Sequence, residues 1–232
     1  MNIVVFGANG PTGRLVTTQA LEAGHRVTAF TRRPEAFPVA HENLVIAEGD
    51  VHDAAAVASA IKGQDAVLST LGVPYGKATI TVYSNGVANI AAGMAEHGVT
   101  RLACVSSSAT DPSAGPHGGW FFEHVLQAYV TGVLGKTLYD DMRRMEALVV
   151  ASDLEWTIIR PSGLFDSDAV SDYAVGENYL PGTFTSRTDL ANFVLRQATD
   201  ATYSRRIAAV TTSEGAPSLL QMIRREAFAK RD

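Results

Sequence analysis

Short apolar runs rich in β-branched and aromatic residues alternate with helix-like segments from the start of the chain nearly to residue 200. The apolar runs predict strands at residues 2–6, 26–31, 43–47, 65–70, 100–106, 155–160 and 206–211. The intervening segments predict helices at residues 11–23, 53–61, 79–97, 136–151, 187–199 and 217–229. Such alternation builds a doubly wound parallel sheet with helices on both faces, so the sequence predicts one α/β domain over residues 1–232.

Cap residues support these boundaries. Asp53 and Ser186 stand where a side-chain oxygen would accept hydrogen bonds from the first N–H groups of a helix. Gly24, Gly63 and Gly98 stand where a helix would end in the left-handed conformation that glycine tolerates. The local residue choices and the wider alternation therefore predict the same elements.

The first thirteen residues, MNIVVFGANGPTG, predict a dinucleotide-binding turn of the Rossmann type. Glycines at three-residue spacing after an apolar strand allow a tight turn, let backbone N–H groups approach a pyrophosphate, and let the next helix pack closely. The strand-like run RVTAFT follows at 26–31 and completes strand, helix and strand within about thirty residues. The residues expected to bind the cofactor here are Gly7, Asn9, Gly10, Pro11, Thr12, Gly13 and Arg14.

The end of the second predicted strand indicates which dinucleotide binds. An acidic residue there would bind the ribose 2′-hydroxyl of NAD, but residues 27–34 read VTAFTRRP and contain no acid. Arg32 and Arg33 instead offer planar guanidinium groups suited to a 2′-phosphate. The sequence therefore favours NADP over NAD, against the alternative that the two arginines are ordinary solvated charges.

Ligands of such sheets bind outside the carboxyl ends of the strands, so the polar and small residues there are further candidates. Asp50 and Val51 are expected beside the adenine, and Leu71 and Gly72 near the nicotinamide half. The fifth and sixth predicted strands bring Ser106, Pro161 and Ser162 to the same rim.

Composition describes a globular chain and narrows the classes of partner. Of its 232 residues, 46% are hydrophobic and 19% charged, with a net charge of −5 that gives no electrostatic footprint for nucleic acid. Cys104 is the single cysteine, it lies in an apolar strand-like run, and it is expected to pack rather than to react. No apolar stretch is long enough to span a membrane and no leader is recognisable, which predicts a cytoplasmic protein. The histidines show no metal-ligand spacing, so no metal site is expected.

Several blocks resemble the atypical short-chain dehydrogenase/reductases of the NmrA-like, NAD(P)H-binding group. The resemblance covers most of the chain, and within the group it is nearest to the biliverdin reductase B, or flavin reductase-like, branch. The blocks that carry it are GANGPTG at 7–13, TRRP at 31–34, GDVHD at 49–53, LSTLG at 68–72, ACVSS at 103–107, residues 142–165 and SRTDLANFVL at 186–195.

The resemblance implies a Tyr and Lys catalytic pair that this chain lacks. Counting back from Glu146, the Lys position holds Met142 and the Tyr position holds Leu138. Tyr139 and Arg143 share a helix face but are out of register by one residue, so Tyr139 is retained as a weaker catalytic candidate. Lys136 is as well explained by a solvated charge as by a catalytic role. The flavin reductase-like branch supports Ser106 as a hydrogen-bond donor to the substrate.

Three segments, residues 111–137, 161–186 and 212–232, are expected on the substrate side. The first contains His117 and His124, either proton donors in a lid or plain surface histidines. Its aromatic side chains would line an apolar pocket, contact a second subunit, or fill the core. They are Trp120, Phe121, Phe122 and Tyr129.

Two functions follow from the sequence. The first is an NADPH-dependent oxidoreductase that transfers hydride to an apolar or conjugated small molecule such as a flavin, quinone or tetrapyrrole, which takes its proton from water. The second is a non-catalytic NADP(H) sensor that binds a protein partner, as some NmrA-like relatives do. The cofactor-binding residues and aromatic segment favour the first, and the missing Tyr and Lys favour the second.

Overall fold

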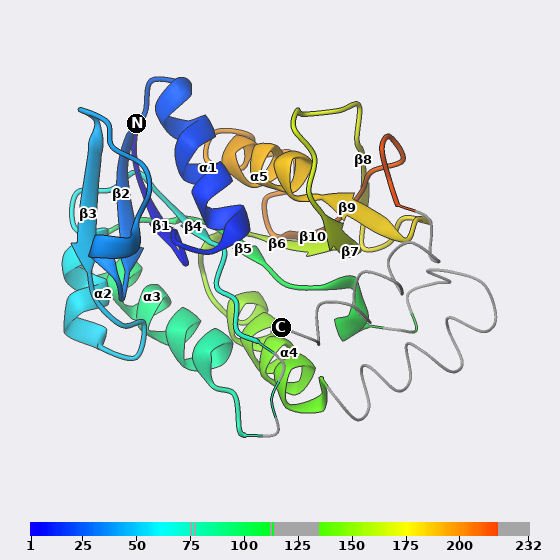
Figure 1. Ribbon diagram of the computed structural model, residues 1–232. Coiled ribbons are helices and arrows are strands. Elements are labelled where there is room, and N and C mark those ends of the chain that lie inside the picture. The colour runs from blue at the N-terminus through cyan, green and yellow to red at the C-terminus, as the bar shows by residue number, and fades with distance from the viewer. Residues whose placement is uncertain (75, 77, 112, 114–134, 218–232) are drawn as a thin grey trace.

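The computed structural model describes residues 1–74, 76, 78–111, 113 and 135–217, and its centre is an eight-stranded sheet (Figure 1). The strand order is β3-β2-β1-β4-β5-β6-β10-β8, and all neighbours pair in parallel except β8, which is antiparallel to β10. The strands are β1 (Asn2–Phe6), β2 (Arg26–Thr31), β3 (Leu44–Glu48), β4 (Ala66–Ser69), β5 (Arg101–Val105), β6 (Glu155–Pro161), β8 (Ala174–Glu177) and β10 (Arg206–Thr211). This is the doubly wound Rossmann-type fold predicted from the sequence, with its order reversing beside β1 and β4.

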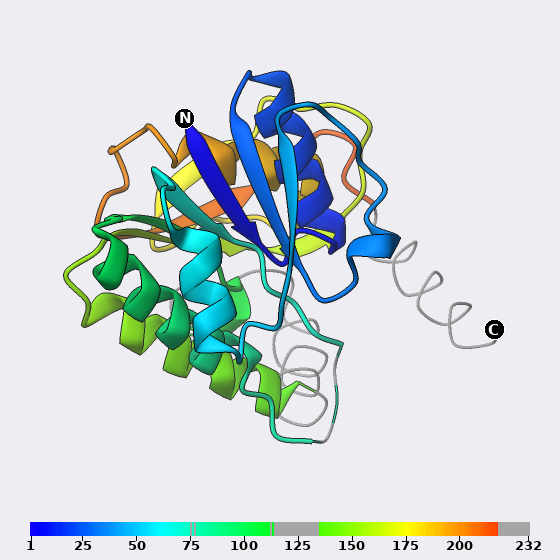
Figure 2. The ribbon, with the colours of Figure 1, turned by 90° about the vertical axis from the view of Figure 1, so that its left-hand side faces the viewer.

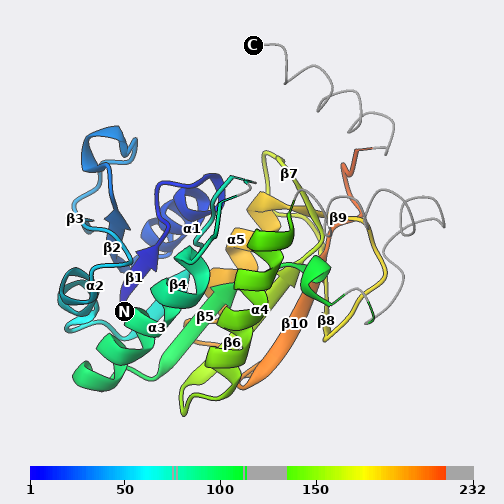
Figure 3. The ribbon, with the colours of Figure 1, turned by 90° about the horizontal axis from the view of Figure 1, so that it is seen from below.

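Helices cover both faces of the sheet (Figures 1 and 2). One face carries α1 (Pro11–Glu22) and α5 (Arg187–Arg196), which pack on each other. The other carries α2 (Ala54–Ile61), α3 (Val82–His97) and α4 (Lys136–Val150), side by side in that order when seen from below (Figure 3). None of the helices described is long and apolar enough to cross a membrane.

The central strand β1 shows how the sequence divides the core between the two faces. Ile3 and Val5 pack with the α1 and α5 side, whereas Val4 and Phe6 pack with the α2, α3 and α4 side. All four are fully buried, as a strand covered on both faces requires. A continuous apolar run of this kind positions the glycine turn that follows at the edge of a rigid sheet.

The predicted caps are confirmed. Asp53 accepts hydrogen bonds from the N–H groups of Ala55 and Ala56, and Ser186 caps α5 in the same way. Gly24, Gly63 and Gly98 all have positive φ, at 79°, 75° and 70°. The local chemistry of the chain therefore decides where these helices begin and end.

The sequence did not predict the short elements around residues 160–186. These are β7 (Gly163–Phe165) and β9 (Phe184–Ser186), which pair in parallel as a separate two-stranded sheet, and the antiparallel edge strand β8. Two single turns of 3-10 helix, Pro34–Ala36 and Ser108–Thr110, were also not predicted. Segments of three or four residues carry too little periodicity to be recognised. The predicted helix at 217–229 and residues 117–129 lie outside the described residues.

Candidate functional site

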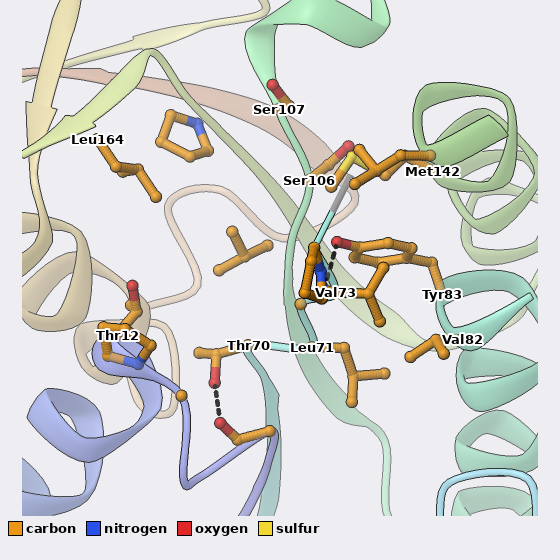
Figure 4. A pocket seen from close by; sticks show the side chains of 18 of the residues that line it. Thr12, Thr70, Leu71, Val73, Val82, Tyr83, Ser106, Ser107, Met142 and Leu164 are labelled. Atoms are coloured by element: carbon orange, nitrogen blue, oxygen red, sulfur yellow. Dashed lines mark hydrogen bonds between the residues drawn. The ribbon is translucent and has the colours of Figure 1, made fainter. Parts of the chain in front are cut away.

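A cleft of about 1050 Å³ opens at the carboxyl ends of the parallel strands. The close view in Figure 4 shows Thr12 and Leu164 on one side of it and Met142, Tyr83 and Val82 on the other, with Ser106 between. The sequence-predicted residues that line it are Gly7, Asn9, Gly10, Pro11, Thr12, Arg32, Arg33, Asp50, Val51, Leu71, Gly72, Ser106, Tyr139, Pro161 and Ser162. Gly13 and Arg14 are not in the cleft wall.

The glycine turn after β1 leaves no room for side chains at two positions. Gly7 has a φ of 76°, and a Cβ there would lie 2.6 Å from the carbonyl oxygen of Thr70. A Cβ at Gly13 would lie 2.2 Å from the Gly7 carbonyl oxygen, so the absence of a side chain at Gly13 lets α1 pack closely against the turn. Thr70 holds β4 against this turn, because its N–H donates to the Phe6 carbonyl at 2.9 Å.

The start of α1 is open to an anion. Gly10 is the N-cap and has no side chain to accept the first N–H groups, while Pro11 occupies the first turn. The positive end of the helix dipole and its uncapped N–H groups therefore face the cleft beside Thr12. These features fit the pyrophosphate of a dinucleotide.

Arg14 and Asn9 bind each other at this turn. The guanidinium Nε and Nη2 of Arg14 donate to Asn9 Oδ1 at 3.0 and 2.6 Å. Arg14 is thus held behind the turn, and Asn9 is the member of the pair that reaches the cleft.

The end of the cleft beside β2 and β3 carries most of its charge. Arg32 is 72% exposed in its side chain and lies 3.9 Å from Asp50, and the Arg33 guanidinium has no hydrogen-bond partner in the described chain. The backbone and side chain of His52 hydrogen-bond the Asp50 carboxylate and hold its pKa below the usual range. His52 in turn contacts Thr81 at 3.2 Å, which ties the end of β3 to the start of α3.

Ser106 directly follows β5 and lies in the middle of the cleft (Figure 4). The residue is 3% exposed, its N–H donates to the Ile159 carbonyl, and its hydroxyl oxygen has no hydrogen-bond partner among the described residues. Buried polar atoms in native structures are nearly always paired, and an exception needs an explanation. A hydroxyl left without a partner in a cleft wall is available to a bound ligand atom.

The wall formed by α4 is apolar at the positions where the family resemblance implies Tyr and Lys. Leu138 and Met142, at those two positions, both line the cleft. Tyr139 also lines it and is 6% exposed. Arg143 turns away, donating to the Thr110 carbonyl at 2.8 Å and pairing with Asp140.

Tyr83 is a cleft residue that the sequence pattern did not predict. It lies in the first turn of α3, is 2% exposed, and its hydroxyl contacts the backbone N–H of Val73 at 3.4 Å (Figure 4). A buried carboxylate, Asp141 of α4, accepts from the N–H groups of Tyr83 and Ser84 and so takes the place of the missing N-cap. A carboxylate at a helix N-terminus is also favoured by the helix dipole, so this contact fixes Tyr83 against the cleft.

A buried ion pair holds the loop after Ser106. Arg160 of β6 binds Glu146 of α4 through two hydrogen bonds at 3.0 and 2.7 Å. Glu146 also accepts from the Thr110 hydroxyl, and Arg160 reaches Asp111 at 3.4 Å. The pair therefore fastens the short helical turn that begins two residues after Ser106.

The far wall comes in part from β7 and the residues that precede β9, which the sequence did not predict. Ser162 donates its hydroxyl to the Gly182 carbonyl at 3.0 Å and its N–H to Thr185. Leu164 of β7 and Arg187, the first residue of α5, complete this wall.

Two other candidates are structural or solvent-facing. Cys104 is fully buried and burial raises the pKa of its thiol far above the usual range, which confirms its packing role. Lys136 is 67% exposed in its side chain and pairs with Asp140 one turn along α4.

A Rossmann-type sheet with this glycine turn, uncapped helix and cleft defines the class of dinucleotide-binding proteins. The sequence matches the family model described as NAD(P)H-binding over residues 7–201. The chain therefore belongs to this NAD(P)H-binding family, in agreement with the resemblance seen in its motifs.

Curated relatives are similar over different shares of the chain. An uncharacterized protein of Mycobacterium tuberculosis is 36% identical over 108 residues, which is 46% of this chain and 12% of that protein. The chain thus spans only a small part of the length of that relative. A Bacillus subtilis protein named as an uncharacterized sugar epimerase is 28% identical over 205 residues, covering 84% of this chain and 86% of its own.

Solved structures share the whole fold at low identity. A short-chain dehydrogenase/reductase from Veillonella parvula in complex with NADP has a TM-score of 0.75 and 18% identity, covering 94% of this chain and 99% of its own. An anaerobillin reductase from Escherichia coli O157:H7 has a TM-score of 0.74 and 21% identity, covering 94% and 100%. These likenesses establish the architecture.

Proposed function

We propose that this protein is an NADPH-dependent reductase that transfers hydride to an apolar or conjugated small molecule, such as a flavin, quinone or tetrapyrrole. The observation that carries the proposal is the buried hydroxyl of Ser106, which has no partner in the described part of the chain and lies in the wall of a cleft that also holds the glycine turn. An unsatisfied buried hydroxyl costs about 1–3 kcal/mol, which a heteroatom of a bound acceptor would recover.

The residues around the turn support one orientation of the cofactor. Gly7, Asn9, Gly10 and Thr12 would surround the pyrophosphate, and Arg32 and Arg33 would bind the 2′-phosphate of NADPH. Asp50 and Val51 would border the adenine. Leu71, Gly72, Pro161 and Ser162 would border the nicotinamide half, where Gly72 has open space around it. When bound, NADPH supplies the hydride.

The protein's own groups would orient the acceptor. Ser106 would donate a hydrogen bond to an acceptor oxygen or nitrogen, and Tyr139 is a second polar group in the same cleft. Leu138 and Met142 give an apolar surface against which a conjugated ring system packs and from which water is excluded. The acceptor gains one hydride and one proton, and flavins, quinones and tetrapyrroles can take that proton from water. Among the structural neighbours, the protein described as an anaerobillin reductase supports this class of acceptor.

A second function is favoured by one observation. The positions at which the resemblance implies Tyr and Lys hold Leu138 and Met142, and both side chains line the cleft. A protein that binds NADP(H) without catalysing a reaction, and that passes the redox state to a protein partner, would need neither group.

NADPH oxidation followed at 340 nm against flavins, quinones, biliverdin and simple carbonyls separates the two functions. We expect turnover with one conjugated class, and we expect Ser106→Ala to lower kcat/KM for that acceptor by about tenfold, the loss of one hydrogen bond. Ser152→Ala is the matched control, since Ser152 bonds the Val149 carbonyl at the far end of α4. Tight NADPH binding without turnover across the whole panel would overturn the reductase and favour the sensor.

A further inference from the structure

The charged side chains in the cleft fall into two separate groups. Arg32, Arg33 and Asp50 stand at the ends of β2 and β3, whereas Arg187 begins α5 directly after β9. The N–H of Ser162 donates to Thr185 at 2.9 Å, which places β9 beside the end of β6. Four strand-to-strand steps separate β2 from β6, roughly 19 Å at about 4.8 Å per step. Arg187 therefore lies on the β6 side of the cleft, away from the β2 and β3 end that holds Arg32 and Arg33.

Arg187 retains most of its hydrogen-bonding capacity. Its Nη1 pairs with Asp166 Oδ1 at 2.7 Å, the one side-chain hydrogen bond that this guanidinium makes within the described residues. Arginine has five N–H donors in a planar fork that matches carboxylate and phosphate oxygens. The Asp166 side chain is 74% exposed, and an ion pair with such a partner is worth little in water. The Arg187 side chain itself is only 25% exposed, so an anion in the cleft would be better shielded than Asp166 is.

The surroundings of Arg187 define the rest of its ligand. Leu164 and Pro161 contribute apolar surface, Met142 faces Leu164 across the cleft, and Ser106 between them contributes a hydroxyl that has no partner among the described residues (Figure 4). A ligand that spans this part of the cleft has an apolar body, a heteroatom for Ser106 and an anionic group for Arg187.

We propose that Arg187 binds a carboxylate or phosphate group of the acceptor, so that the reductase selects conjugated acceptors that carry an anionic substituent. This inference rests on the proposed function, because it assigns the specificity of the same cleft. Asp166 holds the guanidinium in the cleft wall when the acceptor is absent.

Matched acceptor pairs that differ only in their charge test this inference. FMN and riboflavin differ by a phosphate, and biliverdin and its dimethyl ester differ by two carboxylates. For Arg187→Met we expect KM to rise about tenfold or more for the anionic member of a pair, with the neutral member unchanged. Arg187→Lys should recover part of the loss, because it keeps the charge without the fork. Arg196→Met, at the exposed far end of the same helix, is the control.

Binding measured without turnover keeps the two proposals separate. The fluorescence of FMN and riboflavin, and the absorbance of biliverdin and its ester, report their Kd for the NADP⁺ complex. Loss of anion-selective binding in Arg187→Met would support the inference even if no acceptor were reduced, in which case only the proposed function would fail. Equal losses for charged and neutral acceptors, no binding of any acceptor, or a loss confined to NADPH affinity would each overturn it.

Discussion

Replacing Arg32 and Arg33 with alanine tests the cofactor preference. Arg32 is 72% exposed in its side chain and its pairing with Asp50 at 3.9 Å is long, so removing it should change the free energy of unfolding by less than about 1 kcal/mol. A charge-assisted hydrogen bond to a phosphate is worth about 1.5–3 kcal/mol, or about ten- to a hundredfold in Kd. Because the site is exposed, we expect the lower end of this range for each arginine.

Kd values for NADPH and NADH, measured by nucleotide fluorescence at low and high salt, provide the assay. The double variant should lose NADPH affinity while its NADH affinity stays nearly constant, and the difference should shrink at high salt, where exposed charges are screened. Arg26→Ala is the matched control, since Arg26 is an exposed arginine at the opposite end of β2. Equal losses for the two nucleotides would refute the reasoning.

Four further outcomes are expected. Gly13→Ala should destabilise the fold by about 1–3 kcal/mol in urea titrations and weaken NADPH binding, because its Cβ would meet backbone at 2.2 Å. Glu146→Gln should lower the free energy of unfolding by about 3 kcal/mol, because buried Arg160 would keep only the partly exposed Asp111 as a partner charge. A loss below about 1 kcal/mol would show that Asp111 and water compensate the charge. Cys104 should not react with a thiol reagent at pH 8 in the folded protein, and it should react after the protein is unfolded. Labelling of the folded protein would contradict this prediction. Hydrogen bonds from His52 lower the pKa of Asp50 in the folded state. The contribution of Asp50 to stability should therefore be complete above a pH of about 4 and be lost as the pH falls through the lowered pKa. Asp50→Asn should remove this part of the acid dependence of Tm.

The glycine turn was predictable because local chemistry decides it. Only glycine tolerates the φ of 76° at Gly7 and the 2.2 Å approach at Gly13, so the sequence there has few alternatives. The strand ends were predictable for a related reason, since each apolar run stops where the sheet meets the cleft. Ser106, Pro161 and Ser162 follow such runs, and all three line the cleft wall as their positions predict.

The residues that the sequence did not predict depend on contacts between distant segments. Tyr83 reaches the cleft because Asp141, 58 positions later, accepts the N–H groups at the start of α3. The sequence shows an aspartate on an amphipathic helix, which ordinarily reads as a solvated charge, and nothing in its neighbours marks it as fully buried. The residue pattern of one helix does not show that a side chain from another helix caps its N-terminus.

Arg187 was not predicted although the sequence contained a signal for it. The block SRTDLANFVL was assigned to the family motif, and Ser186 was correctly predicted to cap α5, which places the next residue at the start of a helix whose N-terminus faces the cleft. The sequence pattern did not reveal β9, because three residues give no periodic pattern. Without β9, the start of α5 could not be placed relative to the cleft. The residues proposed to bind the cofactor come mainly from the first strands and turns, whereas Arg187, proposed to select the acceptor, follows a short irregular element late in the chain. The sequence therefore predicts the cofactor site better than the acceptor site.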